Sequence, residues 1–360
     1  MHLIPKLYRL EELPIHTSLF GHLPYARGQV DVLLPSTNGS IQVAGWLLSP
    51  EEPLDAVEVH LDEEHLFTLP LNARPDVEEF HAWLPHATHT GFDFALPVSR
   101  SQWSGTTRLD LVAISRGVRR VRLAQLVRSD VDQLPSPPEE YIFRVSHMRA
   151  AHSFKVSGLK TFGDILEPLC RHSKFSEFRR ILDWGCGCGR VTMHFLALSG
   201  LGELLGCDID GAAVRWAAEF LSPARFSVVA PMPPSPYPDA HFDLIYSYSV
   251  FTHLKRDVQR AWLEEMHRLL APRGMFVATT RGQLALEFGL ASRSATFPSD
   301  GIVDAHLDPT LDSVAPTGYY RTTYQSRDYT CREFGKLFDI VEYVERGANN
   351  LQDVVVMRKR

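Results

Sequence analysis

The stretch ILDWGCGCGRVT, residues 181–192, places three glycines on alternate positions directly after an apolar run. Glycine in regular structure costs roughly 1 kcal/mol relative to alanine, so Gly185, Gly187 and Gly189 indicate a backbone with a special task. The apolar run before them predicts a short buried strand, and the residues after them carry apolar groups at helical spacing. A strand, a glycine turn and a helix together direct backbone N–H groups at a ligand.

A second chemical group is Asp208, which ends the apolar run 203–208 that follows the glycines. At the tip of the next strand, a carboxylate can accept hydrogen bonds from both hydroxyls of a ribose. Asp210 precedes a run with helical periodicity and is predicted to cap that helix. The pattern therefore indicates a site for a ligand that contains a ribose.

Two familiar nucleotide fingerprints are absent from this part of the sequence. The dinucleotide motif G-x-G-x-x-G fails in both registers, because Arg190 and Thr192 stand where the last glycine is needed. The phosphate-binding motif G-x-x-x-x-G-K-[ST] is also missing, since Gly335-Lys336 lacks the earlier glycine and the following hydroxyl. The ligand is therefore not expected to present a pyrophosphate to the glycine loop.

What remains is D-x-G-x-G-x-G followed by an acid at the end of the next strand, and this resembles the class I S-adenosylmethionine-dependent methyltransferases. The resemblance covers roughly residues 140–360. Residues 241–254 are similar to the family's fourth strand, residues 262–280 to a helix, a turn and the fifth strand, and residues 337–360 to its closing hairpin. It implies an α/β, Rossmann-like domain whose mostly parallel sheet ends in an antiparallel C-terminal hairpin.

The resemblance implies S-adenosyl-L-methionine as the cofactor and S-adenosyl-L-homocysteine as its product. The cofactor-binding residues it implies are Asp183, Gly185, Cys186, Gly187, Gly189, Arg190, Asp208, Ile209, Met232, Ser247 and Tyr248. Many members place an acid after the third strand for the adenine amino group, but here the strand 226–229 is followed by Ala-Pro-Met-Pro-Pro. We therefore expect apolar contacts and backbone groups to hold the adenine.

Methyl transfer from a sulfonium needs alignment, exclusion of water and, for some nucleophiles, a base. His253 is the candidate base because it follows the fourth strand and titrates near neutrality; the alternative is that it only hydrogen-bonds the backbone at a helix start. Tyr248 and Arg281 are further catalytic candidates. The substrate-binding candidates are Tyr319, Tyr320, Arg321 and Gln352. No metal is predicted, because the loop triplet Asp304, His306 and Asp308 is too weak a pattern.

The elements that must position these residues fall into two parts. Residues 28–128 offer short, often alternating apolar runs separated by turns, which predicts an all-β sandwich. The predicted divisions are an N-terminal extension and sandwich over residues 1–130, a proline-rich linker over 131–140, and the methyltransferase domain over 141–360. The linker predicts a limited interface between independently cored halves, with no cofactor group in the sandwich.

Two further features bear on the acceptor. The sandwich resembles immunoglobulin-like accessory modules found beside transferases of cell-surface glycan biosynthesis, on the strength of a Gly-Trp pair, ARPDV at 73–77 and HTGFDFALP at 89–97. Residues 282–326 form a long segment rich in small and aromatic groups, which predicts a lid or binding loop.

Composition and net charge restrict the partners and the cellular location that are expected. The 360 residues are 44% hydrophobic, with a formal net charge of −6, which gives no global attraction to nucleic acid or acidic membranes. No apolar stretch reaches the length of a membrane span, and the first twenty residues do not have the pattern of a signal peptide. Five cysteines without a zinc-like pair are typical of a reducing compartment, so a cytoplasmic location is expected.

The function predicted from the sequence is transfer of a methyl group from S-adenosylmethionine to a small-molecule or sugar/glycan-type acceptor, with oxygen as the expected nucleophile. Two alternatives stay open: a glycan-binding or scaffold protein whose methyltransferase fold binds cofactor without turnover, and a protein methyltransferase. The sequence does not indicate an oligomeric state.

Overall fold

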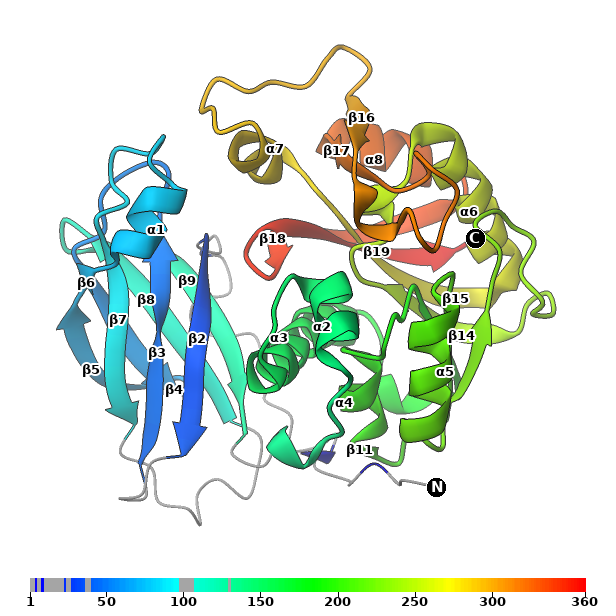
Figure 1. Ribbon diagram of the computed structural model, residues 1–360, viewed down its shortest axis with the longest axis horizontal. Helices are drawn as coiled ribbons and strands as arrows, with labels where there is room; N and C mark the ends of the chain where they lie inside the picture. Colours follow the sequence, from blue (N-terminus) through cyan, green and yellow to red (C-terminus); the bar gives the residue numbers. More distant parts are fainter. Residues whose placement is uncertain are drawn as a thin grey trace.

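In a computed structural model of the chain, residues 4, 8–9, 23, 27–35, 40–96, 107–128 and 131–360 are described. Most of the predicted N-terminal extension therefore lies outside the described residues. The chain forms an all-β part followed by a larger α/β part, and the long helix α3 (Ala151–Cys170) lies between them (Figure 1). Within the described residues, no helix is both long and apolar enough to span a membrane.

The all-β part consists of two four-stranded antiparallel sheets. One has the order β2 (Arg27–Pro35), β3 (Ile41–Leu48), β7 (His89–Leu96) and β6 (Asn72–Ala73), with helix α1 (Pro75–Phe80) after β6. The other has the order β5 (Glu64–Pro70), β4 (Ala56–Leu61), β8 (Thr107–Ser115) and β9 (Val118–Val127). Alternate side chains of β3 and β4 are buried in the same apolar core, as expected for facing sheets.

The α/β part is built on one seven-stranded sheet. Its order is β13 (Arg225–Val228), β12 (Glu203–Asp208), β10 (Arg180–Trp184), β14 (Phe242–Ser247), β15 (Leu270–Thr280), β19 (Gln352–Lys359) and β18 (Phe338–Ala348). The first five strands are parallel, and β19 and β18 are antiparallel to their neighbours. The predicted fold class, with its antiparallel closing hairpin, is confirmed.

Helices and smaller elements surround this sheet. The helices are α2 (Glu139–Ser146), α4 (Thr192–Leu196), α5 (Gly211–Phe220), α6 (Arg256–Leu269), α7 (Gln283–Gly289) and α8 (Arg327–Phe334). The 3₁₀ turns are η3 (Val131–Gln133), η4 (Phe175–Glu177), η5 (Phe251–His253) and η6 (Pro309–Leu311). Two short ladders pair β1 (Tyr8–Arg9) with β11 (Leu198–Ser199), and β16 (Ile302–Leu307) with β17 (Arg321–Gln325).

Residues 282–326 are more ordered than the sequence indicated. This segment contains α7 and the antiparallel pair β16–β17 rather than one long loop. Thr323 of β17 donates to the carbonyl of Leu254, and Gln325 bonds to Gln259 of α6. The segment is therefore hydrogen-bonded to α6 and to the residue that follows η5. Its Tyr320 lies against His253 of η5.

The prediction of a limited interface between the two parts is wrong. A single apolar core continues from the sandwich through α3 into the large sheet, and it includes Leu111, Leu126, Phe162 and Leu244. Most side chains of α3 are buried, because the helix packs against β9 on one side and against the methyltransferase sheet on the other. The predicted linker also takes part, since Val131 and Leu134 are buried in this core.

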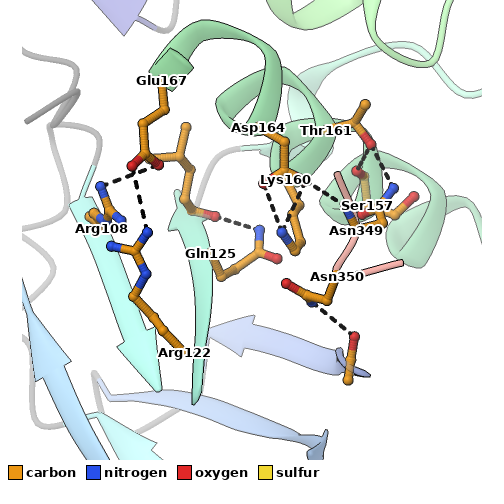
Figure 2. A network of polar contacts seen from close by, with 12 residues as sticks. Arg108, Arg122, Gln125, Ser157, Lys160, Thr161, Asp164, Glu167, Asn349 and Asn350 are labelled. Carbon is orange, nitrogen blue, oxygen red and sulfur yellow. Dashed lines mark hydrogen bonds and ion pairs between the residues drawn. The ribbon is translucent and has the colours of Figure 1, made fainter. Parts of the chain in front are cut away.

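Polar contacts across the same interface bury charged groups (Figure 2). Arg108 of β8 and Arg122 of β9 both reach Glu167 of α3, at 3.5 Å and 3.6 Å, and both also contact Asp110, which is fully buried. Gln125 of β9 donates to the carbonyl of Val156 at 3.5 Å. Glu167 also contacts Arg171 at 3.4 Å, so each buried charge of this cluster lies beside a group of opposite sign, which makes the burial energetically tolerable.

We expect Glu167→Gln to lower the free energy of unfolding by about 2–3 kcal/mol, because it removes a carboxylate that the buried Arg108 and Arg122 share. Chemical denaturation measures the change. Glu219→Gln, at an exposed position on α5, is the matched control and should leave stability within about 0.5 kcal/mol of the native chain. Equal losses in the two variants would show that the cluster does not hold the two parts together.

Candidate functional site

The glycine loop follows β10 and crosses the end of β12. Gly185, Gly187 and Gly189 have φ angles of 81°, 52° and 80°, which lie in the left-handed region. A Cβ built on Gly185 would lie 2.2 Å from Cγ2 of Val250, so that position has no room for a side chain. The N–H groups of Gly185 and Cys186 both donate to the carbonyl of Cys207, at 2.8 Å and 3.1 Å. The turn is thereby attached to the end of the neighbouring strand.

Asp208 stands at the end of β12 and organises the loop. Its two carboxylate oxygens accept one backbone N–H each, from Gly187 and from Asp210, both at 2.8 Å. Burial raises the pKa of this carboxyl, while the two N–H groups act in the opposite direction. Each oxygen keeps lone-pair capacity for a further donor, so the carboxylate can still accept the hydroxyls of a diol.

Asp210 caps α5, as the sequence predicted. Its side chain accepts from the N–H groups of Ala212 and Ala213, and it forms an ion pair with Arg144 of α2. This second bond ties the helix before α3 to the glycine-loop end of the sheet.

Asp183, at the end of β10, is buried beneath the loop. Its Oδ2 accepts from the hydroxyls of Thr192 and of Tyr246, the latter at 2.9 Å. Burial raises the pKa of this carboxyl to about 7, and the two hydroxyl bonds only partly oppose the shift. Asp183 is thus a carboxyl whose charge depends on pH near neutrality.

These groups open onto a cavity of about 450 Å³ at the carboxyl ends of β10, β12 and β14. This volume falls within the roughly 300–1,000 Å³ range of ligand pockets. Next to the loop the wall is apolar, with Ile209, Val229, Leu254 and Trp262. The predicted adenine site without an acid matches this apolar wall.

His253 lies on the cavity wall at the end of η5. Its Nδ1 is 2.9 Å from the carbonyl of Arg321, and its ring stacks on Tyr320 with centroids 4.0 Å apart. Because a carbonyl only accepts, Nδ1 must carry a proton. Burial, and then the charge of Arg281, lower the pKa of the imidazole well below its usual value. His253 is therefore neutral at pH 7, with Nε2 unprotonated. His253 thus bonds the backbone through Nδ1 and keeps Nε2 unprotonated, and its role as a base stays a prediction.

The structure brings most of the predicted site residues to this one cavity. Its wall includes Asp183, Gly185, Cys186, Gly187, Arg190, Asp208, Ile209, Tyr248, His253, Arg281, Tyr319, Tyr320 and Gln352. Tyr248 accepts a hydrogen bond from Asn349 at 2.7 Å and lies under the guanidinium of Arg190. The amide of Gln352 is held between Thr279 and Ser249.

Four predicted residues do not line the cavity. Gly189 packs on Leu221 behind the loop, and Ser247 is buried in the sheet. Met232 is 46% exposed, and Arg321 turns away to the carbonyls of Gly318 and Asp304. The sequence places these four residues near the predicted site, but a position along the chain does not indicate the direction in which a side chain points.

Sequence reasoning missed the part of the wall that comes from the sandwich. Arg27, Gly28, Gln29 and Val30 of β2 and Gln125 of β9 all line the cavity. The expectation that the sandwich stands apart from the site is therefore wrong. No local pattern marks these residues, because strand β2 reaches the site only through the packing of α3 and the closing hairpin.

A family model described as a methyltransferase domain matches residues 181–274, which run from β10 through α6 to the start of β15. The chain contains a methyltransferase domain. Its cofactor is S-adenosylmethionine, as the resemblance implied, and the sequence expectation of a methyltransferase is confirmed.

Several solved structures are similar to part of the chain. A protein from Pyrococcus horikoshii OT3 is 20% identical, with 55% of this chain and 89% of that chain covered and a TM-score of 0.41. An S-adenosylmethionine-dependent methyltransferase from Mesorhizobium loti is 16% identical, with 54% and 98% covered and a TM-score of 0.38. A putative S-adenosylmethionine-dependent methyltransferase from Listeria monocytogenes is 14% identical, with 56% of this chain and 99% of that chain covered and a TM-score of 0.39.

The residues present fit this cofactor. The side-chain-free face of the glycine loop gives room for close approach, Asp208 keeps acceptor capacity for the ribose, and the apolar wall suits an adenine. The carboxylate of Asp208 lies at this end of the cavity, and a negative charge there favours a ligand with a sulfonium and an ammonium group.

We expect Asp208→Asn to weaken S-adenosylmethionine binding by about 1–3 kcal/mol in calorimetry, because charge-assisted hydrogen bonds to a diol become neutral ones. Asp243→Asn is the matched control: that carboxylate also accepts two backbone N–H groups, from Arg179 and Arg180, but at the opposite end of the sheet. Equal effects in the two variants would remove Asp208 from the cofactor site.

Asp183 generates a prediction about pH. A raised carboxyl pKa means that the folded chain holds a proton that the unfolded chain has released. Between about pH 4 and 7 the contribution of Asp183 to stability therefore falls by about 1.4 kcal/mol per pH unit as pH rises. Denaturation curves at pH 5 and pH 6.5 should show this slope reduced in Asp183→Asn. The same slope in both proteins would mean that Asp183 is ionised throughout.

Proposed function

We propose that the chain transfers the methyl group of S-adenosylmethionine to a hydroxyl group of a small-molecule or sugar-type acceptor. The observation that carries this proposal is the neutral His253, whose tautomer leaves Nε2 unprotonated on the cavity wall. Nitrogen or sulfur nucleophiles react without a dedicated base more readily than a hydroxyl does. A positioned neutral imidazole therefore favours oxygen as the nucleophile.

Bound S-adenosylmethionine would supply an electrophilic methyl carbon, which the acceptor oxygen attacks while the bond between this carbon and sulfur breaks. His253 accepts the hydroxyl proton at Nε2, and the carbonyl of Arg321 holds the ring through Nδ1 so that the accepting nitrogen keeps its direction. Tyr320 stacks on the ring and excludes water from that face. Tyr248 is fixed by Asn349 at the end of β14, which makes it a positioning residue for the groups that react.

The size and walls of the cavity support a small acceptor. A space of about 450 Å³ that must also hold the cofactor suits a small molecule or a single sugar unit as the acceptor. Gln29, Asn349 and Gln352 supply amide groups to the wall, and amides hydrogen-bond hydroxyls in both directions. The sandwich contributes to this wall, which gives it a role in holding the acceptor.

The test uses the full chain with methyl-labelled S-adenosylmethionine and a panel of sugars, sugar phosphates, hydroxy acids, amines and peptides. We expect label on a hydroxyl of a small acceptor and a matching yield of S-adenosylhomocysteine. Transfer to a peptide or protein would favour the protein methyltransferase. Cofactor binding without transfer to any acceptor would favour the non-catalytic alternative.

We expect His253→Asn to lower turnover by roughly 10²–10⁴-fold while cofactor affinity stays unchanged, because the variant loses the base but not the binding wall. His306→Asn, an exposed histidine on β16, is the control and should keep full turnover. Native turnover should be flat from about pH 6 to 8, since the low pKa keeps His253 neutral across that range. A turnover that follows the titration of an ordinary histidine would contradict this assignment.

A further inference from the structure

Two arginines on the cavity wall, Arg27 and Arg281, have no polar side-chain partner among the described residues. The other strong cations of the wall are engaged: Arg144 pairs with Asp210, Lys160 pairs with Asp164, and Arg190 donates to Ser157 and Thr161. Arg27 and Arg281 are thus positive groups whose counter-charge is not supplied by their surroundings.

Arg27, the first residue of β2, reaches the cavity from the sandwich. Its guanidinium lies 5.3 Å from the ring of Trp46 and 5.6 Å from the ring of Phe288, and its Nε is buried without a hydrogen-bond partner. Burial lowers its pKa to about 10, so the group still carries its charge at neutral pH. A buried cation held only by aromatic faces is costly unless an anion joins it.

Arg281 directly follows β15 and precedes α7, the helix that carries Phe288. Its guanidinium is 6.0 Å from the ring of Tyr324, and its charge acts on the imidazole of His253 and on Tyr320. Arg281 is therefore close to the candidate base. An anion bound there would lie beside the hydroxyl that His253 deprotonates.

Arg27 is held in place by the contacts between the two parts of the chain. Asn350, at the tip of the β18–β19 hairpin, donates to the carbonyl of Gly28 at 3.2 Å, directly next to Arg27 (Figure 2). Asn349 donates to Asp164 and Thr161 of α3, which fixes the hairpin tip to that helix. The start of β2 is thus attached to the methyltransferase domain rather than free to move.

The acids and the two arginines of the cavity come from different elements. Asp183 and Asp208 lie at the ends of β10 and β12, where the cofactor site lies, whereas Asp210 caps α5 and is paired with Arg144. Arg27 and Arg281 belong to β2 and to the end of β15. A ligand that spans the cavity would meet the Asp208 carboxylate at the glycine loop and the guanidinium groups of Arg27 and Arg281 elsewhere on the wall.

We propose that the acceptor carries an anionic group, a carboxylate or a phosphate, which Arg27 of the sandwich and Arg281 of the methyltransferase domain bind together. This inference rests on the proposed function, because it assigns the acceptor of that same site. Guanidinium groups bind carboxylates and phosphates through paired N–H donors. The sandwich then completes the acceptor site, and a bound anion also offsets the charge of Arg281 that acts on His253.

The experiment measures binding to the full chain saturated with S-adenosylhomocysteine, so that the carboxylate of the cofactor already occupies its own site. The probes are glucuronate, glucose 6-phosphate, neutral glucose and cationic glucosamine. Their binding is measured by calorimetry or by the shift in Tm. We expect one or both anionic probes to bind at least tenfold more tightly than glucose and glucosamine. A preference between the two anions tells a carboxylate acceptor from a phosphate acceptor.

Arg27→Met and Arg281→Met should each weaken the preferred anionic probe at least tenfold and leave S-adenosylhomocysteine affinity unchanged. Arg281→Lys should recover part of the binding, since the charge is kept without the paired donors. The control is Arg215→Met, at an exposed position on α5, which should change nothing. All variants are first compared with the native chain for Tm, and the lysine variant keeps the test informative if a methionine variant unfolds.

Two results would overturn the proposal. One is equal binding of charged and neutral probes, and the other is a loss of cofactor affinity in Arg27→Met or Arg281→Met as large as the loss of probe affinity, which would assign the anion to the cofactor. These results are distinct from a failure of the proposed function. Anionic probes that bind through both arginines without any methyl transfer would support the anion site and contradict turnover.

Discussion

The burial of helix α3 on both sides is the constraint on which the rest of the structure depends. Two glycines on the helix allow this packing: a Cβ on Gly163 would lie 2.9 Å from Leu126 of β9, and one on Gly158 would lie 2.4 Å from the carbonyl of Arg190. The sandwich and the segment that follows the glycine loop therefore both approach the same helix closely. Because apolar surface on α3 is removed from water by both parts at once, separating them would expose a large share of the core.

The position of α3 also determines where the cavity lies. The helix carries the Lys160–Asp164 pair and the hydroxyls of Ser157 and Thr161, and these bond in turn to Arg190 and to the hairpin tip. The glycine loop is thus bordered by α3 on one side and by strands of the sheet on the other. The sandwich, docked on the far side of α3, extends past the helix end so that β2 reaches the cavity wall. Because α3 packs against both parts of the chain, residues of the sandwich and of the methyltransferase domain line the same cavity.

Most of the methyltransferase part could be predicted from the sequence because its signals are local. The run before the glycines became β10, the run 203–208 became β12 with the same bounds, and the helix expected at the start of residues 262–280 is part of α6. Asp210 caps α5, and the hairpin turns next to Asn349 and Asn350. Periodicity, glycine clusters and capping residues act over a few positions, and each is visible in a single stretch of chain.

Contacts between residues that are far apart in the sequence cannot be predicted from such local patterns. The proline-rich stretch before α2 has the composition of a linker, yet Val131 and Leu134 are buried, because a short segment can supply apolar side chains to a core formed by other elements. The direction of Arg321 and the burial of Ser247 were likewise decided by neighbours distant in sequence. The sequence by itself indicated the strands, the glycine loop, an acid at the end of the next strand and the resemblance that implies the cofactor. Only the tertiary structure decided that Arg27 faces the same cavity as His253 and Arg281, because residues far apart along the chain are brought together by packing against shared partners and not by any pattern between them.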